Sequence, residues 1–410
     1  MRVALLHYTA PPVIGGVESV LARQARLLAD AGHQVTVVAG RGARPDPRVA
    51  LVRIARADTR HPDVLAAQAA LDRGTVPAAF AGLRLALERD LLAAARGQDV
   101  VVAHNVCSLH KNLALTAALH DLNCGPGFPP LVAWHHDLAW TADRYRADLH
   151  PGDPWNLLRT AWPGVLHVAV SEERRAALAG LLHIDPRAIV VIENAIDGET
   201  FLVSPQTRAL LAPLALHGAA PVLLLPVRIA PRKNVELALC VLAELRKGGD
   251  DARLLITGPP DPHNPTAAAY LDRLLEQRER LGLAQAAHFL SEDGRRLPDR
   301  LMADLYRLAD LLFLPSRDEG FGLPLLEAAV SRLPIVCAAL PSLRAIAGTA
   351  ATYFSPDDAP AAIAEQVRRR LVNDPAYGLA LRARRVYDPR RIHGEQVEPL
   401  LRRAIAARQP

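Results

Sequence analysis

Short apolar runs typical of buried strands alternate with helical patterns along the whole chain. This alternation predicts parallel α/β layers rather than an all-β or α+β architecture. The runs form two series, which predicts two Rossmann-like, doubly wound domains that face each other across a cleft. The expected strands are Val3–His7, Gln34–Ala39, Val100–His104, Leu131–Trp134, Leu166–Val170 and Ala188–Ile192 in the first series, and Val222–Val227, Arg253–Thr257, Ala287–Leu290, Leu311–Leu314 and Ile335–Ala338 in the second.

The chain is long enough for two hydrophobic cores. It has 410 residues, of which 50% are hydrophobic, and a domain takes roughly 150 residues. Prolines punctuate the segment Val203–Ala220, which lacks periodicity and therefore predicts the boundary between the domains. We expect a first domain over residues 1–205, a second over 206–387, and a C-terminal segment over 388–410 that forms a helix from Asp388 to Arg408.

Charge and apolar content limit the class of partner. A net charge of +5 and a pI near 9.2 suit anionic small molecules, and peripheral contact with an anionic membrane, but are too modest to indicate nucleic-acid binding. No apolar run approaches the roughly 18 residues of a membrane span, and the first apolar run is too short for a signal peptide. The chain has four cysteines, Cys107, Cys124, Cys240 and Cys337. They lack the spacing of a zinc site or a disulfide framework, so we expect the protein to reside in a reducing cytoplasm.

The segment Ser316–Glu327 carries the most specific chemical signal. It follows the apolar run Leu311–Leu314 and places Glu319 and Glu327 eight positions apart across a glycine turn that opens a helix. Glycine lets backbone amides approach a ligand closely, and the positive end of a helix favours a diphosphate. A carboxylate can accept hydrogen bonds from sugar hydroxyls. We expect Glu319 in the loop and Glu327 in the first helical turn.

The same residues carry a family resemblance. The stretch Glu319–Glu327 resembles the E-x7-E motif of retaining glycosyltransferases of family 4, which have the GT-B fold. An acidic surface turn before an amphipathic helix would explain two glutamates alone, but not the glycines in a strand-turn-helix context. The resemblance implies that Glu319 orients the donor sugar, that Glu327 holds ribose hydroxyls, and that the amides of Gly320, Phe321, Gly322 and Leu323 contact the donor diphosphate.

Two cations follow the first strand of the second series. Arg228 and Lys233 stand in a loop after Val222–Val227, where fixed positive charge can stabilise a leaving diphosphate without a metal. Their spacing resembles the arginine and lysine pair of the family. The neighbouring Arg232 is expected to be solvated.

The first domain offers three further positions. Gly15 and Gly16 precede a helix and can present amides to a phosphate, and the family carries a similar Gly-Gly-x-Glu. Of the adjacent His135 and His136, which point to opposite faces of a strand, the resemblance assigns the contact with the donor sugar to His136. Asp137 would position that loop, and Asn194 would belong to a loop near the domain boundary.

The resemblance implies a retaining hexosyl transfer from a UDP-sugar or GDP-mannose to an acceptor hydroxyl, with no cofactor and no metal. The acceptor would be a small molecule, a glycan or a lipid-linked sugar. Two alternatives remain open, a nucleotide-sugar epimerase and a non-catalytic nucleotide-sugar-binding protein. The arginine-rich stretch Arg41–Arg60 is either a solvated loop with an edge strand or a patch for membrane phosphates.

Overall fold

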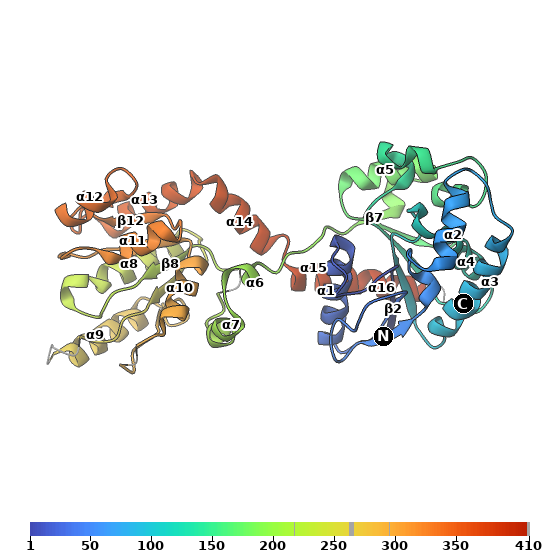
Figure 1. Ribbon diagram of the computed structural model, residues 1–410. Coiled ribbons are helices and arrows are strands. Elements are labelled where there is room, and N and C mark those ends of the chain that lie inside the picture. Colours follow the sequence, from blue (N-terminus) through green and yellow to red (C-terminus); the bar gives the residue numbers. More distant parts are fainter. Residues whose placement is uncertain (217, 262–265, 295, 408–410) are drawn as a thin grey trace. The chain divides into compact units, whose positions relative to one another are not determined.

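The structure, a computed structural model, describes residues 1–216, 218–261, 266–294 and 296–407. The chain forms two compact units (Figure 1). Unit 1 contains Met1–Ala195 together with the segment from Tyr387 on, and unit 2 contains Ile196–Val386. The α/β class with two doubly wound sheets is confirmed. The cleft that the resemblance implies between the domains stays a prediction.

The division lies between Ala195 and Ile196, not between residues 205 and 206. The guanidinium of Arg23 in unit 1 donates a hydrogen bond to the carbonyl of Ala195. Beyond it, the hydroxyl of Thr207 donates to Asp304 of unit 2 at 2.6 Å. The proline-punctuated segment is therefore folded into unit 2. It follows α6 (Gly198–Leu202) and forms α7 (Pro205–Leu211) and the 3₁₀ turn Ala212–Leu214. Pro205 and Pro213 occupy the first turns of the latter two, where a missing N–H costs nothing.

Unit 1 has a seven-stranded parallel sheet in the order β3-β2-β1-β4-β5-β6-β7. Alternate residues of β1 enter different cores, since successive side chains of a strand point to opposite faces. Val3 and Leu5 pack with α1 and α16, and Ala4 and Leu6 pack with α3 and α4. The strands are β1 (Arg2–Leu6), β2 (Gln34–Ala39), β3 (Ala50–Arg53), β4 (Val100–His104), β5 (Leu131–His135), β6 (Leu166–Ala169) and β7 (Ile189–Val191).

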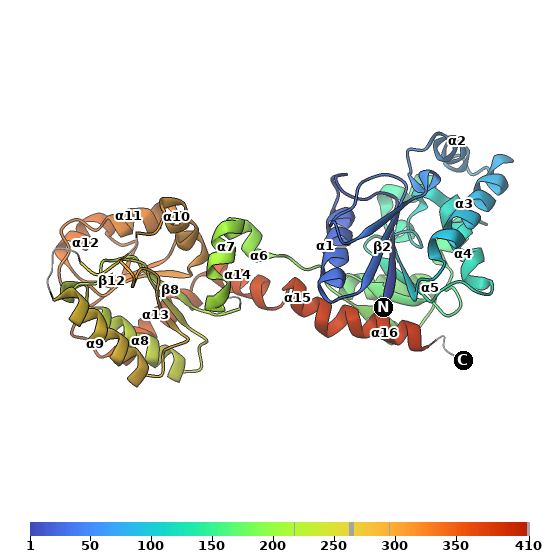
Figure 2. The same cartoon turned by 90° about the horizontal axis from the view of Figure 1, so that it is seen from below.

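The helices of unit 1 cover both faces of this sheet (Figure 2). They are α1 (Gly16–Asp30), α2 (Pro62–Leu71), α3 (Ala79–Ala95), α4 (Leu113–Cys124), α5 (Glu172–Leu182), α15 (Pro389–Ile392) and α16 (Glu398–Ala406). The predicted C-terminal helix is interrupted, because residues His393–Val397 between α15 and α16 form a π turn. The predicted helix end at Arg408 lies outside the described residues.

Unit 2 has a six-stranded parallel sheet in the order β10-β9-β8-β11-β12-β13 around one apolar core. Its strands are β8 (Val222–Leu225), β9 (Arg253–Ile256), β10 (Ala287–Phe289), β11 (Leu311–Leu314), β12 (Ile335–Ala338) and β13 (Thr352–Phe354). Its further helices are α8 (Val235–Lys247), α9 (Ala267–Arg280), α10 (Asp299–Leu308), α11 (Leu323–Val330), α12 (Pro341–Ala347), α13 (Pro360–Val372) and α14 (Pro375–Arg385).

In the described part of the chain, no helix combines the length and the apolar character that crossing a membrane requires.

Candidate functional site

Both sheets reverse their strand order at a defined place. The reversal lies between β1 and β4 in unit 1 and between β8 and β11 in unit 2. In open α/β sheets, ligands bind beyond the carboxyl ends of the strands at such a switch point. Most of the predicted site residues follow β8 and β11, or β1 and β5 next to the other switch point.

The two predicted cations in the loop after β8 differ in how exposed they are. Lys233 ends a short 3₁₀ turn and is 8% exposed, whereas the side chain of Arg228 is 57% exposed. Asn234 adopts a left-handed conformation with φ 53° and donates from Nδ2 to the carbonyl of Pro315 at 3.2 Å. This bond ties the β8 loop to the β11 loop, which brings Lys233 beside the predicted carboxylate.

Lys233 and Glu319 form a buried ion pair. The Nζ atom of Lys233 lies 2.5 Å from Oε1 of Glu319, and both side chains are less than a tenth exposed. The same carboxylate oxygen accepts a hydrogen bond from the hydroxyl of Ser316 at 2.8 Å. The hydroxyl of Ser342 donates to the backbone carbonyl of Glu319 at 2.9 Å. Breaking a buried pair leaves an uncompensated charge, so each partner holds the other in place.

The glycine turn after β11 is built as the sequence predicts, with one correction. Gly322 precedes α11 with φ 96°, and a Cβ atom there would lie 2.6 Å from the side chain of Leu343. Gly320 has open space at that position, and Phe321 and Leu323 are exposed. The helix begins at Leu323, so Glu327 is its fifth residue.

Glu327 therefore lies in the second helical turn, not in the first. The hydroxyl of Tyr306 on α10 donates a hydrogen bond to its Oε2 atom. Burial, with the nearby Glu327 carboxylate, raises the pKa of Tyr306 above its usual value, so the phenol stays protonated and remains a donor. Tyr306 thus fixes the orientation of a carboxylate that is otherwise exposed.

A pocket of about 790 Å³ opens at this edge of the sheet in unit 2. It contains both the Arg228 cation and the Glu327 carboxylate, and the turn after β9 forms part of its wall. Residues that line it are Arg228, Thr257, Gly258, Pro259, Arg296, Leu297, Asp299, Met302, Ala303, Tyr306, Leu326, Glu327, Val330 and Ser331. Pockets of 300–1,000 Å³ are the usual size for small-molecule ligands.

In unit 1, the glycines open α1. Gly15 caps the helix in an extended conformation, and a Cβ atom on Gly16 would meet nothing within 4 Å. The Glu18 carboxylate lies behind them. It accepts a hydrogen bond from the Thr9 hydroxyl at 2.5 Å and lies 3.8 Å from Nε2 of His7. The turn is therefore held by Glu18, while Gly16 stays accessible.

His136 belongs to a pair of imidazoles. Its Nε2 atom lies 3.1 Å from Nδ1 of the fully buried His104. The side-chain oxygen of Asn105, which has φ 60°, accepts hydrogen bonds from the backbone amides of His136 at 2.8 Å and Asp137 at 3.1 Å. Burial, and then the charge of His7, lower the pKa of His136 to about 3. At neutral pH this imidazole is uncharged.

The other predicted residues near His136 have different surroundings. His135 is buried and its Nε2 atom lies 3.1 Å from Nδ1 of His167 on β6. Asp137 accepts a hydrogen bond from Arg144 at 3.1 Å. Asn194 lines a small cavity beside α1. The opposite orientations of His135 and His136 agree with the expectation for adjacent strand residues.

Arginines of the stretch Arg41–Arg60 are largely engaged within unit 1. Arg41 pairs with Asp58 at 3.0 Å, and Arg48 pairs with Asp30 at 2.8 Å and with Asp46 at 2.9 Å. Arg56 pairs with Asp63 at 3.1 Å. These pairs favour the interpretation of a structured loop and edge strand over a free basic patch.

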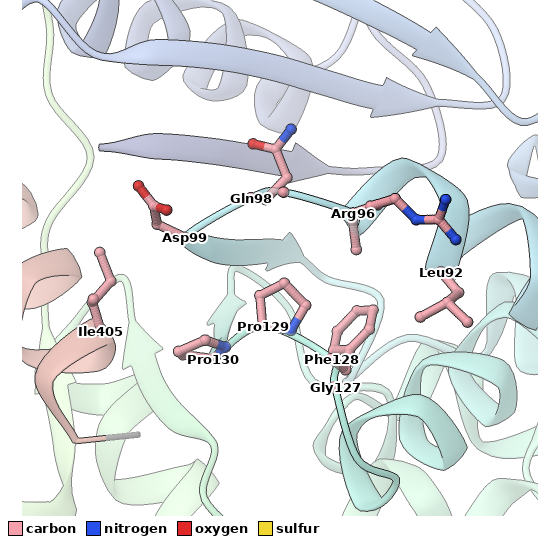
Figure 3. A pocket seen from close by; sticks show the side chains of 11 residues that line it. Leu92, Arg96, Gln98, Asp99, Gly127, Phe128, Pro129, Pro130 and Ile405 are labelled. Atoms are coloured by element: carbon pink, nitrogen blue, oxygen red, sulfur yellow. The ribbon is translucent and has the colours of Figure 1, made fainter. Parts of the chain in front are cut away.

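Another hollow of unit 1 lies away from the predicted residues. It has about 590 Å³ and lies at the amino ends of β4 and β5, where Asp99 and Phe128 border it (Figure 3). Asp99 is already engaged by the guanidinium of Arg2 at 2.8 Å. Among the described residues, no three His, Cys, Asp or Glu side chains gather in a way that could hold a metal ion.

Several site residues were not found from the sequence. Tyr306 and Asn105 had no local signal, because each acts on a residue that is distant in the chain or through its backbone conformation. Ser316 stands inside the predicted motif, but its hydrogen bond to Glu319 depends on the turn. His104 ends a correctly placed strand, and a histidine at a strand end was the available signal.

Comparisons with known proteins match both units to glycosyltransferases. Residues 209–386 match the family model of glycosyl transferases group 1, and residues 14–200 match that of glycosyltransferase family 4. A D-inositol 3-phosphate glycosyltransferase of Kineococcus radiotolerans is 31% identical over 53% of this chain and 51% of its own length. The serotype-specific mannosyltransferase WbdA of Escherichia coli is 32% identical over 50% of this chain and 24% of its own length.

The matches to these curated relatives thus span about half of the first protein and about a quarter of the second. A solved sucrose-phosphate synthase of Thermosynechococcus elongatus aligns with 99% of this chain and 99% of its own, at 18% identity and a TM-score of 0.40. The two family models adjoin each other and together extend from residue 14 to residue 386. The first part of the chain thus matches glycosyltransferase family 4, and the second part matches the glycosyl transferases group 1.

Proposed function

We propose that this protein transfers a sugar from a nucleoside diphosphate sugar to an acceptor hydroxyl, with retention of the anomeric configuration and without a metal. One observation carries the proposal. Arg228 and Glu327 line a single pocket at the switch point of unit 2, so a cation for phosphate and a carboxylate for ribose hydroxyls meet in a space of nucleotide size.

The buried pair of Lys233 and Glu319, which follows β8 and β11, supports a role in leaving-group stabilisation. As the bond from the sugar anomeric carbon to the diphosphate oxygen breaks, negative charge grows on the diphosphate. Lys233, Arg228 and the amides of residues 320–323 supply fixed positive charge and donors for it. The acceptor oxygen bonds to the anomeric carbon on the same face, and its proton passes to an oxygen of the departing phosphate.

Glu319 is then an orienting group and not a nucleophile. Its carboxylate already carries hydrogen bonds from Lys233 and Ser316. Such a carboxylate can hold the donor sugar through its remaining lone pairs while it positions Lys233. His136, as a neutral imidazole, would contribute a hydrogen bond to the sugar.

The donor is a UDP-sugar or GDP-mannose, and the acceptor is a small molecule, a glycan or a lipid-linked sugar. The similarity to a D-inositol 3-phosphate glycosyltransferase and to a serotype-specific mannosyltransferase supports this range.

A donor panel tests the proposal. UDP- and GDP-sugars are incubated with the protein, with and without an extract of glycan and lipid acceptors, and nucleotide release is measured. We expect release that requires acceptor, persists in EDTA, and gives a product with the donor's anomeric configuration by NMR. Isomerised donor in the absence of acceptor would instead identify an epimerase, and binding without turnover would identify a nucleotide-sugar-binding protein.

A further inference from the structure

A small cavity in unit 1 lies beneath α1, where the chain leaves the unit and where it returns. It has about 40 Å³ and is bordered by α1, by Trp134 of β5, by residues 192–195 and by the returning segment at Pro389–Val397. Figure 1 shows α15 next to α1, and the two helices are in contact. The cavity therefore touches both segments that connect unit 1 to the rest of the chain.

Three buried polar side chains line this cavity. Gln24 is 6% exposed, Trp134 is 3% exposed and His393 is 7% exposed. Within the described ranges, neither amide atom of Gln24, neither ring nitrogen of His393, nor Nε1 of Trp134 has a hydrogen-bond partner in the protein. Buried polar atoms in native proteins are nearly always paired, because leaving one unpaired costs its full desolvation penalty.

The inventory of atoms identifies what can pair them. Gln24 offers two N–H donors and one carbonyl acceptor, and Trp134 offers one donor. Burial lowers the pKa of His393, although Glu398 and Asp30 oppose this shift and His33 adds to it. The neutral ring then offers one donor and one acceptor. An anion would leave the acceptors unpaired and a cation would leave the donors unpaired, whereas water both donates and accepts.

The size of the cavity agrees with this choice. A water molecule needs roughly 10–15 Å³ of such space and two to four polar partners. About 40 Å³ therefore holds two or three waters.

The backbone of the returning segment is irregular where it borders the cavity. His393 begins the π turn that separates α15 from α16. Single π turns interrupt helices at a cost in regular hydrogen bonding and often occur where a side chain has a particular task. Here the turn carries a polar ring into an otherwise apolar core that includes Ile392, Val397 and Leu401.

We propose that this partly open cavity is a water site, in which a cluster of two or three waters bridges Gln24, Trp134 and His393 and so fastens the returning segment to α1 and β5. The site also supports the predicted sugar contact. The ring of Trp134 stacks on His104 with 5.5 Å between centroids, and His104 is the hydrogen-bond partner of His136.

A high-resolution crystal structure of the wild-type full chain tests the proposal without any variant. We expect ordered waters within hydrogen-bond distance of at least two of the three side chains. A dry cavity, a single ion, or direct pairing among the side chains would overturn it.

Hydrogen exchange provides the second measurement. Gln24→Met keeps the side-chain volume but removes both amide atoms, so we expect loss of at least one water and about tenfold faster exchange in residues 393–397. Leu27→Met, in the same cavity wall without a polar atom, is the matched control and should leave exchange unchanged. Equal exchange rates in the wild type and Gln24→Met would contradict the bridging role. If Gln24→Met does not fold, His393→Gln is used in its place.

Discussion

The two units place different chemistry at the carboxyl ends of their sheets. At the switch point of unit 2, the ammonium of Lys233 contacts the carboxylate of Glu319. Next to the switch point of unit 1, where β4 and β5 end, the imidazole of His136 contacts that of His104, and burial lowers the pKa of both. One site is organised by fixed opposite charges and the other by neutral hydrogen-bonding rings.

The proposed ligands would account for this difference. Fixed cations stabilise charge that develops on a phosphate, and an adjacent carboxylate orients a buried lysine. A neutral imidazole has one donor and one acceptor, which suits an uncharged hydroxyl. The two sites thus fit the proposed division, in which unit 2 would bind the diphosphate and unit 1 would contact the sugar.

Removal of the lysine should have the largest effect. Lys233→Ala leaves the carboxylate of Glu319 buried beside Ser316 without its cation and deletes a charge from the proposed diphosphate site. We expect donor turnover to fall about 10²- to 10³-fold, the usual effect of losing one stabilising donor. Nucleotide release with the donor found in the panel measures it.

Arg232→Ala is the matched control for this variant. Arg232 is exposed, stands next to Lys233 in the same loop, and should leave turnover within about twofold. Comparable losses in both variants, or full activity of Lys233→Ala, would remove the contrast between the units.

Acid should affect unit 1 through its buried histidines. Burial lowers the pKa of His167 to about 4 and that of His136 to about 3, from an ordinary value near 6.5. Above pH 6.5 both rings are neutral in the folded and unfolded chain. Below it the unfolded chain binds protons that the folded chain does not, so stability falls until the folded pKa is reached, by about 1.4 kcal/mol per pH unit for each ring.

Hydrogen exchange of the full chain between pH 7 and pH 4.5, corrected for intrinsic rates, measures this loss separately in each unit. We expect the protection of β5 and β6 to fall with pH, and His167→Asn to flatten part of the slope. Equal slopes in the wild type and the variant would show that His167 does not govern the acid stability of unit 1.

Local pattern was sufficient for the elements that carry the site. β11 and the turn before α11 could be predicted because Leu311–Leu314 is wholly apolar, Gly322 takes a positive φ and Pro324 favours a first helical turn. β3 and β13 were not among the predicted strands. Both are short edge strands in which few side chains are buried, so their patterns do not show the period of a buried strand.

The local sequence pattern could not predict contacts between residues that are distant in the chain. The Lys233 and Glu319 positions could be chosen for their chemistry, but their pairing depends on β8 and β11 being neighbours in the sheet. The domain boundary was misplaced because Pro205 and Pro213 mark linkers and helix starts alike. In the structure, the hydrogen bonds from Ser204 and Thr207 to Asp304 join this segment to unit 2.

Asn105 supplies an intermediate test within unit 1. Asn105→Ala removes the acceptor for the amides of His136 and Asp137 and places alanine at φ 60°. We expect a loss of about 1–3 kcal/mol in stability. Asn105→Gly relieves the strained backbone conformation but does not restore the lost hydrogen bonds. It should therefore recover part of the stability, while the donor KM stays above that of the wild type. Full recovery of both would show that Asn105 acts through its backbone alone.

Tyr306 should give the smallest effect and the finest comparison. Tyr306→Phe keeps the ring in the core of unit 2 but removes the hydrogen bond that orients Glu327. Because one such bond contributes about 1 kcal/mol, we expect the donor KM to rise about fivefold with little change in kcat. Glu327→Gln should raise the KM in the same way, and in the double variant the two effects should be less than additive, since both act on the same contact to ribose. Strictly additive effects would mean that Tyr306 supports the fold of α10 and not the carboxylate.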